Sequence, residues 1–161
     1  MTRILLYRAA NDALGKLIRY FTESEWGHVA IYAGGATYEQ TWPGVKKTEG
    51  RNTADLSLIP PLLDEVAMIA WLETSVSAKL RYNWPRLVAM IVVYPLRWFF
   101  NKLGWVPFSA AIFGEICSSY GDEAIKVGGL DAWPYRGEHA TVPGDFVLYP
   151  GFKHEIPAGD G

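Results

Sequence analysis

The sequence predicts an α+β fold in which an antiparallel sheet packs against a helix that carries the only cysteine, Cys117. Two observations lead to this prediction. The run HVAIYAGG, which starts at His28, is followed at once by ATYEQT, and two β-rich runs joined by a glycine pair are typical of a hairpin. Far downstream, Ile112 to Val127 reads as a helix that ends at Gly128 and Gly129, with Cys117 close to its first turn.

The remaining elements of the first half follow in chain order. Arg3 to Arg8 reads as a short strand, and Asp12 to Phe21 has apolar residues at helical spacing. Val45 to Glu49 is expected to extend the second hairpin strand past a kink at Pro43–Gly44. Arg51 to Asp64 shows no period and is expected to be a connector, whereas Val66 to Leu72 is an apolar strand candidate.

The second half is richer in helical patterns. Ser75 to Leu103 has helix-compatible runs that Pro85 and Pro95 divide into two or three pieces. Asp145 to Tyr149 is expected to be the last strand, followed by a frayed tail. With 161 residues, half of them hydrophobic, residues 1–161 are expected to form a single domain.

Composition excludes several classes of protein. The 15 basic residues against 17 acidic ones provide no basic stripe for a phosphate backbone, so no nucleic acid partner is expected. No signal peptide is recognisable at the amino terminus. The apolar stretch Leu87 to Phe100 contains Pro95 and Arg97 and is shorter than the about 20 residues of a membrane span, so it is a core helix pair or a surface hairpin. It mildly favours a lipid-like substrate or peripheral membrane contact.

Cys117 is the candidate nucleophile. A helix amino terminus can lower a thiol pKa to roughly 3.5–7.5, and its backbone N–H groups can stabilise an oxyanion. The alternative is that Cys117 is a small buried hydrophobic residue. Three histidines and one cysteine without metal-ligand spacing predict no metal site.

His28, at the start of the first hairpin strand, is the candidate base, and Glu39 on the next strand is placed to orient its ring. The alternatives are a strand-end histidine bound to backbone or water and an ordinary exposed glutamate. His139 beside Glu138 is a second candidate for the orienting group, whereas His154 near the tail is expected to take no part.

The segments WGHVAIYAGGATYEQTWPGV and GEICSSY resemble the circularly permuted NlpC-like peptidases, in which a histidine motif precedes a cysteine motif. The family wording is similar to SHVGIY, an acidic strand residue and a helix start of CSE type. The resemblance implies a papain-like fold in permuted order, with His28 as base, Glu39 as orienting residue and Cys117 as nucleophile. Gly27 replaces the usual serine, and Ser119 stands where a glutamate is common.

The resemblance implies a cysteine hydrolase that cleaves an amide or acyl-ester bond through a Cys117 thioester without a cofactor. Peptides, peptidoglycan and acyl lipids are the substrate classes it suggests. Trp26 and Trp42 flank the expected site and are the best candidates to line a cleft. A non-catalytic binding module of the same fold and an acyltransferase that uses the same thioester remain open, as do compartment and oligomeric state.

Overall fold

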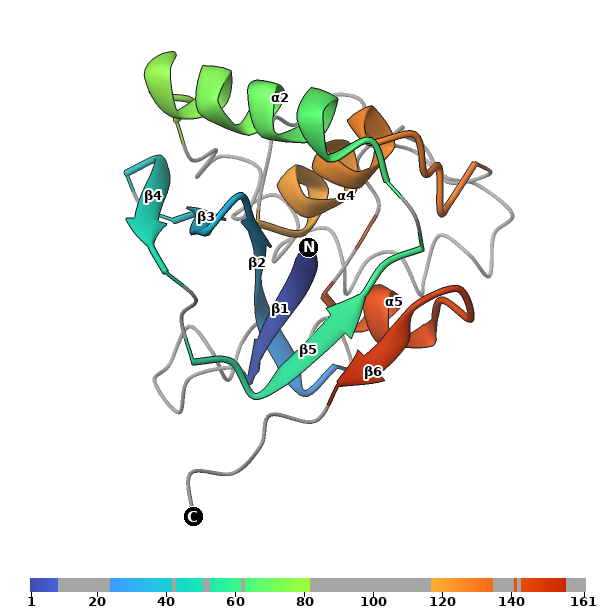
Figure 1. The fold of residues 1–161 in the computed structure, drawn as a ribbon. Helices are drawn as coiled ribbons and strands as arrows, with labels where there is room; N and C mark the ends of the chain where they lie inside the picture. The colour runs from blue at the N-terminus through green and yellow to red at the C-terminus, as the bar shows by residue number, and fades with distance from the viewer. Residues whose placement is uncertain are drawn as a thin grey trace, which may run out of the picture.

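The computed structural model describes residues 1–8, 24–41, 43–50, 53–61, 63–81, 117–134, 141 and 143–155. The elements in this part of the chain, in order, are β1 (Arg3–Arg8), β2 (Trp26–Ala33), β3 (Ala36–Gln40), β4 (Val45–Glu49), β5 (Leu56–Ile59), α2 (Glu65–Ser77), α4 (Cys117–Val127), α5 (Pro143–Leu148) and β6 (Lys153–Glu155). The strands form one antiparallel sheet of order β4-β3-β2-β1-β5-β6, with α2 and α4 stacked over one part of it (Figure 1). The expected α+β class is confirmed.

The β2–β3 hairpin is confirmed, and its turn determines the register of the site. Gly34 and Gly35 both have positive φ angles, 59° and 86°, which a two-residue turn of type I′ requires and which cost glycine little. The turn pairs Ala30 with Glu39, and side chains at diagonal positions of neighbouring strands can reach one another. His28, two residues before Ala30, therefore lies diagonally from Glu39 on the same face.

The main core lies between the sheet and the two longer helices. α4 packs against β2, and α2 packs against α4 and β4. Fully buried side chains come from every layer: Ile4, Leu6, Val29, Ile31, Tyr38, Leu58, Met68, Leu72, Tyr120, Ile125 and Phe146. The buried Ser75 hydroxyl and the Tyr120 hydroxyl share a hydrogen bond of 2.7 Å, which joins α2 to α4.

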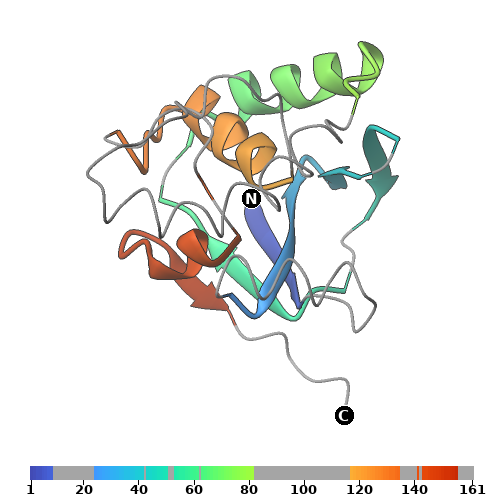
Figure 2. The same cartoon turned by 180° about the vertical axis from the view of Figure 1, so that it is seen from behind.

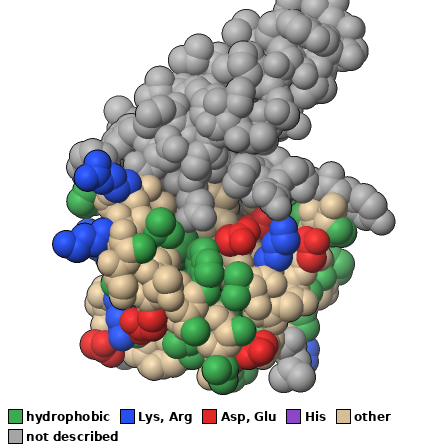
Figure 3. Space-filling view, turned by 90° about the horizontal axis from the view of Figure 1, so that it is seen from above, with side chains coloured by type: hydrophobic (Ala, Val, Ile, Leu, Met, Phe, Trp, Pro, Cys, Tyr) green, Lys and Arg blue, Asp and Glu red, His purple; other side chains and the backbone are tan. Residues whose placement is uncertain are grey.

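The expected strand at Val66 to Leu72 is wrong, because this segment is part of α2. The Asp64 carboxylate accepts a hydrogen bond of 3.0 Å from the backbone N–H of Ala67 and so caps the helix. Met68, Leu72 and Ser75 are buried at spacings of four and three residues. Viewed from the α2 side, hydrophobic side chains lie among acidic and basic ones (Figure 3). Val66, for example, is an apolar residue of α2 that is 81% exposed. Because apolar residues lie on more than one side of α2, the helical spacing of its buried residues is hard to recognise in the sequence.

The structure also corrects two expectations for the middle of the chain. Val45 to Glu49 does not extend β3 but turns back to pair with it as β4, so that Lys46 lies directly opposite Glu39. The connector expected from Arg51 to Asp64 contains β5, which pairs with β1 through Leu58 opposite Ile4. A strand of four residues is too short to show a clear period.

The carboxyl-terminal expectations are wrong as well. Asp145 to Tyr149 is not a strand: Pro143 begins the short helix α5, a position at which proline is favourable because its missing N–H is not needed. The expected frayed tail contains β6, which pairs with β5. Glu155 also accepts hydrogen bonds from Arg3 Nε at 2.6 Å and from a terminal guanidinium nitrogen at 2.9 Å. Seen from behind, α5 and β6 lie together at the end of the sheet away from β4 (Figure 2).

Other expectations are confirmed or lie outside the described residues. Arg3 to Arg8 is a strand, and α4 ends at Gly128 and Gly129, where Gly129 has a φ of 94°. Three segments lie outside the described residues: the expected helix at Asp12 to Phe21, the stretch from Leu87 to Phe100, and residues 112–116. Within the segments that the structure describes, no helix is long and apolar enough to cross a membrane.

Candidate active site

Cys117 is the first residue of α4 and is 7% exposed. The helix can approach β2 closely because Gly121, one turn later, has no side chain. A Cβ atom there would lie 3.0 Å from Val29 Cγ1 and 3.3 Å from Phe146 Cζ. Gly121 therefore allows the amino-terminal turn of α4 to bring the thiol against the start of β2.

The first turn of α4 is also fixed by hydrogen bonds to residue 141. The buried Ser118 hydroxyl donates to the Thr141 carbonyl at 2.6 Å, and the Thr141 hydroxyl donates to the Asp122 carboxylate at 2.9 Å. Burial raises the pKa of Asp122, although the Thr141 hydrogen bond opposes this change. These contacts tie the start of α4, which carries Cys117, to Thr141, which lies later in the chain.

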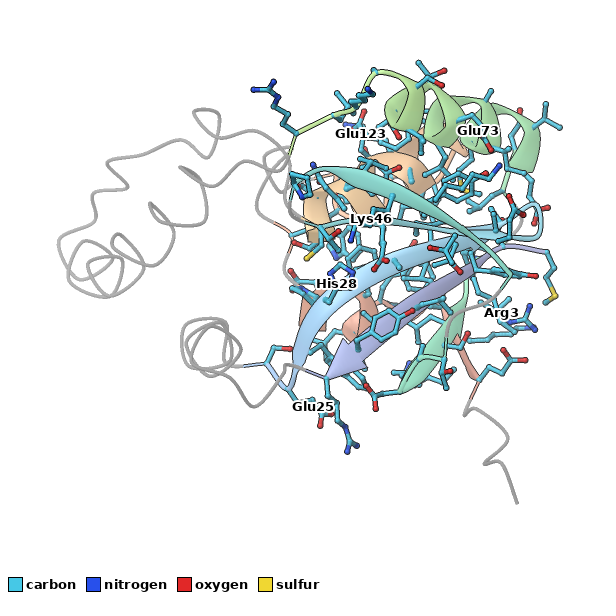
Figure 4. The ribbon with its side chains drawn as sticks, turned by 90° about the vertical axis from the view of Figure 1, so that its left-hand side faces the viewer. Arg3, Glu25, His28, Lys46, Glu73 and Glu123 are labelled. Atoms are coloured by element: carbon cyan, nitrogen blue, oxygen red, sulfur yellow. The ribbon has the colours of Figure 1, made fainter. Side chains whose placement is uncertain are left out.

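His28 and Glu39 meet as the hairpin register requires. His28 Nε2 lies 3.0 Å from Glu39 Oε2, and the two side chains are 24% and 21% exposed. The ring of Tyr7, directly opposite His28 on β1, packs against the imidazole at a centroid distance of 5.6 Å. Figure 4 shows His28 on the same side of the molecule as Lys46, with Arg3 toward the opposite end of the strands.

The His28 ring also forms a hydrogen bond with Cys117. Because Nε2 is bound to Glu39, Nδ1 is the nitrogen left for the sulfur. Burial lowers the pKa of His28, but the hydrogen bonds and negative charges of Cys117 and Glu39 outweigh it and raise this pKa to about 9. Glu39 has a lowered pKa, chiefly because of its hydrogen bond to His28 and despite its partial burial.

The thiol of Cys117 has a pKa below the ordinary value. Burial raises it, but the hydrogen bond and charge of His28 lower it further, as do hydrogen bonds from the backbone N–H groups of Val29 and Ser118. A raised pKa on the imidazole and a lowered pKa on the thiol favour a thiolate–imidazolium pair. Such a pair has its nucleophile already deprotonated.

The Val29 amide is available to the sulfur because the β2–β3 ladder ends beside it. In an antiparallel hairpin, alternate residues direct their backbone groups toward the partner strand. The Gly34–Gly35 turn makes these the odd-numbered residues of β2, and the last paired residues are Ala30 and Glu39. The Val29 N–H thus points toward the β3 side, beyond the last pair, where it donates to Cys117.

The structure thus brings together all three residues predicted from the sequence: Cys117, His28 and Glu39. Sequence analysis missed the Val29 amide and Gly121. A small residue one turn after the cysteine was a visible signal for Gly121, whereas no sequence signal marks the Val29 amide.

The other candidates do not extend this cluster. Trp26 is 8% exposed and belongs to the hydrophobic core, and His154 lies on β6 opposite Leu58, three strands away from β2. Trp42 and His139 lie outside the described residues. The described part of the chain holds no group of three or more residues able to bind a metal ion.

No protein-family model matches the sequence, and a search of curated proteins found no match either.

Proposed function

We propose that this chain is a cysteine hydrolase of papain-like fold, in the permuted order of the NlpC-like peptidases, that cleaves an amide or acyl-ester bond. Cys117 is the nucleophile, His28 the general base and acid, and Glu39 the residue that orients His28. The observation that carries the proposal is the hydrogen-bonded series from Cys117 through His28 to Glu39, closed by the 3.0 Å contact of Nε2 with Oε2.

The mechanism follows from the charges of the pair. The Cys117 thiolate attacks the carbonyl carbon, a C–S bond forms, and the carbonyl electrons move to oxygen. When the tetrahedral adduct collapses, the bond to the leaving group breaks, and the His28 imidazolium gives its proton to that group. Water, deprotonated by the neutral imidazole, then hydrolyses the thioester, and no cofactor takes part.

Two features favour catalysis over a binding module that has only kept the fold. A buried thiol in apolar surroundings has a raised pKa, whereas Cys117 has three hydrogen-bond donors that lower it. An ionised pair in a mostly buried place also costs free energy of folding, and catalysis explains its presence.

Alkylation of Cys117 by iodoacetamide tests the proposal, since no other thiol competes. The wild type is expected to react well below pH 8, and His28→Ala is expected to react only near the pKa of an ordinary thiol, about 8.5. His154→Ala is the matched control and is expected to behave like the wild type. Slow reaction at neutral pH in all three proteins would leave the binding module as the better explanation.

Substrate class is tested next with peptide amides, peptidoglycan fragments and acyl-lipid esters. Product analysis with an added amine or alcohol distinguishes hydrolysis from acyl transfer, because both pass through the same thioester. Cys117→Ala is expected to turn over none of these substrates, which controls for hydrolysis by contaminants.

A further inference from the structure

β4 forms one edge of the sheet, and most of its outer side is open. It is an end strand in the sheet order and pairs with β3 on its inner side. The residues from Lys46 to Gly50 are all exposed. Backbone N–H and C=O groups along such an edge can pair with a further strand. The sequence of the edge decides which strand fits.

Two hydrogen bonds show which residues of this segment direct their backbone groups outward. The Gly50 N–H donates to the Gly35 carbonyl, toward β3, at 2.8 Å. Because backbone groups alternate along an antiparallel strand, the even-numbered residues face β3 and the odd-numbered ones face outward. The Val45 N–H accordingly donates outward, to the Leu80 carbonyl at 3.1 Å.

The backbone groups of Lys47 and Glu49 therefore point outward, where they have no backbone partner in the described part of the chain. Residues 80 and 81 cover only the start of β4. Past its end, Gly50 has a φ of 83°, which turns the chain away from the extended strand. The free edge is thus the short segment 46–50.

The two outward residues carry opposite charges. The Lys47 ammonium lies 2.8 Å from the Glu73 carboxylate on α2 and 3.6 Å from that of Glu49. The Glu49 side chain is 84% exposed and can reach a neighbouring strand. A lysine and a glutamate two residues apart are complementary to the same sequence running in the opposite direction.

We propose that β4 pairs with β4 of a second copy of this chain, antiparallel and around a two-fold axis at Thr48. Lys47 of each copy then lies opposite Glu49 of the other, and each such pair exchanges backbone hydrogen bonds in both directions. Thr48 lies opposite its own copy. The interface is isologous, and it joins the two sheets into one.

Neighbouring registers fit less well. An axis at Lys47 would put two ammonium groups opposite each other and would need the Val45 N–H, which already binds the Leu80 carbonyl. An axis at Glu49 would put two carboxylates opposite each other. Like charges directly opposite destabilise strand pairs, whereas opposite charges stabilise them. Lysines on an edge also discourage unrelated strands, which makes the contact selective for a second copy.

Analytical ultracentrifugation over about 1–500 μM protein tests the contact. The wild type is expected to form a reversible dimer as the concentration rises. Glu49→Pro removes an outward N–H and none that pairs with β3, so it is expected to stay folded and monomeric. Glu49→Lys makes both charge pairs repulsive and is expected to raise the dissociation constant at least about tenfold. Lys153→Glu reverses an exposed charge on β6, at the opposite edge of the sheet, and is expected to dimerise like the wild type.

A disulfide tests the register. Opposite residues of a non-hydrogen-bonded pair have Cα atoms about 4.5 Å apart, a distance that a disulfide can span. In a Cys117→Ala background, Thr48→Cys is expected to form a covalent dimer on mild oxidation. Lys46→Cys is the matched control and is expected to form none, because the axis places Lys46 opposite Gly50 of the other copy.

Three outcomes would overturn the proposal. A wild type that stays monomeric over this range would mean that the lysines of β4 only protect the edge. A dimer that persists unchanged in Glu49→Pro and Glu49→Lys would use another surface. A disulfide at Lys46→Cys but not at Thr48→Cys would exclude the axis at Thr48. Alkylation of Cys117 is expected to be the same in both Glu49 variants as in the wild type, so the hydrolase function is tested separately.

Discussion

The backbone N–H of Val29 donates a hydrogen bond to the sulfur of Cys117, at the point where β3 stops pairing with β2. A sheet amide that would otherwise be used in the ladder thus stabilises a thiolate. The donor belongs to the strand that carries His28, so the imidazole and this amide reach the sulfur from the same element.

The first prediction concerns pH. Hydrolysis needs the thiolate and the imidazolium together, so kcat/KM is expected to rise through the lowered pKa of Cys117 and to fall through the His28 pKa of about 9. Alkylation needs only the thiolate. Its rate is therefore expected to rise with the ionisation of Cys117 at acidic pH and not to fall at alkaline pH. Parallel rate profiles from pH 4 to 10.5 measure both. An alkaline fall near pH 6.5 instead would mean that His28 is not paired with two anionic groups.

The second prediction concerns Glu39→Gln. Loss of the carboxylate removes a hydrogen bond and a charge that raise the His28 pKa, so the alkaline limb is expected to move to lower pH. The rate constant kcat is expected to fall between about 10²- and 10⁴-fold. His154→Ala is the control, because His154 lies on β6, three strands away from the strand that carries His28. An unmoved alkaline limb in Glu39→Gln would reject the orienting role.

The same variant tests stability. The folded-state pKa of Glu39 is lowered, so its stabilising contribution is present above the unfolded value of 4.5 and is lost as the pH falls through the folded value. The free energy of unfolding of the wild type is therefore expected to decline more steeply than that of Glu39→Gln on acidification below pH 4.5. Urea titrations at pH 3 and pH 6 make the comparison.

The third prediction concerns the close approach of α4 to β2. Gly121→Ala places a methyl group 3.0 Å from Val29 Cγ1, which is too close without movement. A destabilisation of about 1–3 kcal/mol is expected, together with a raised thiol pKa as the helix moves away from His28. Glu123→Ala, on the same helix, controls for the helix propensity of alanine. If Gly121→Ala kept the wild-type alkylation profile, the close packing would not be needed for activation.

The fourth prediction concerns β6. Arg3 and Glu155 are 17% and 34% exposed at the side chain and form two hydrogen bonds between β1 and β6. Glu155→Ala is expected to lower the free energy of unfolding by about 1 kcal/mol, after allowance for solvent screening, and to increase amide exchange at Lys153 to Glu155. The exposed Lys153→Ala serves as control. Unchanged exchange would show that strand pairing alone holds β6.

The sequence was informative where signals were local and strong. The glycine pair between two β-rich runs predicted the hairpin, and the order of histidine, carboxylate and cysteine predicted the site. It failed for β5 and β6, whose four and three residues are defined by their partners in the sheet. It also failed for α2, where the Asp64 cap was visible but the apolar run suggested a strand.

One feature of the site could not have been read from the sequence at all. The Val29 amide contributes through its backbone, so its role depends on where the β2–β3 ladder ends rather than on the residue type. That end point depends on the register, which the Gly34–Gly35 turn determines.

The hairpin has a consequence for the order in which reactivity is acquired. His28 and Glu39 belong to neighbouring strands joined by a two-residue turn, and such hairpins form within about 1–10 μs. Cys117 joins them only when α4 docks on β2, a contact between segments far apart in the chain. Until then its thiol is expected to keep the ordinary pKa and react slowly. The thiol of a nascent or damaged chain would therefore react slowly with an alkylating reagent. Rapid labelling of Cys117 at mildly acidic pH would then report only the molecules that have folded completely.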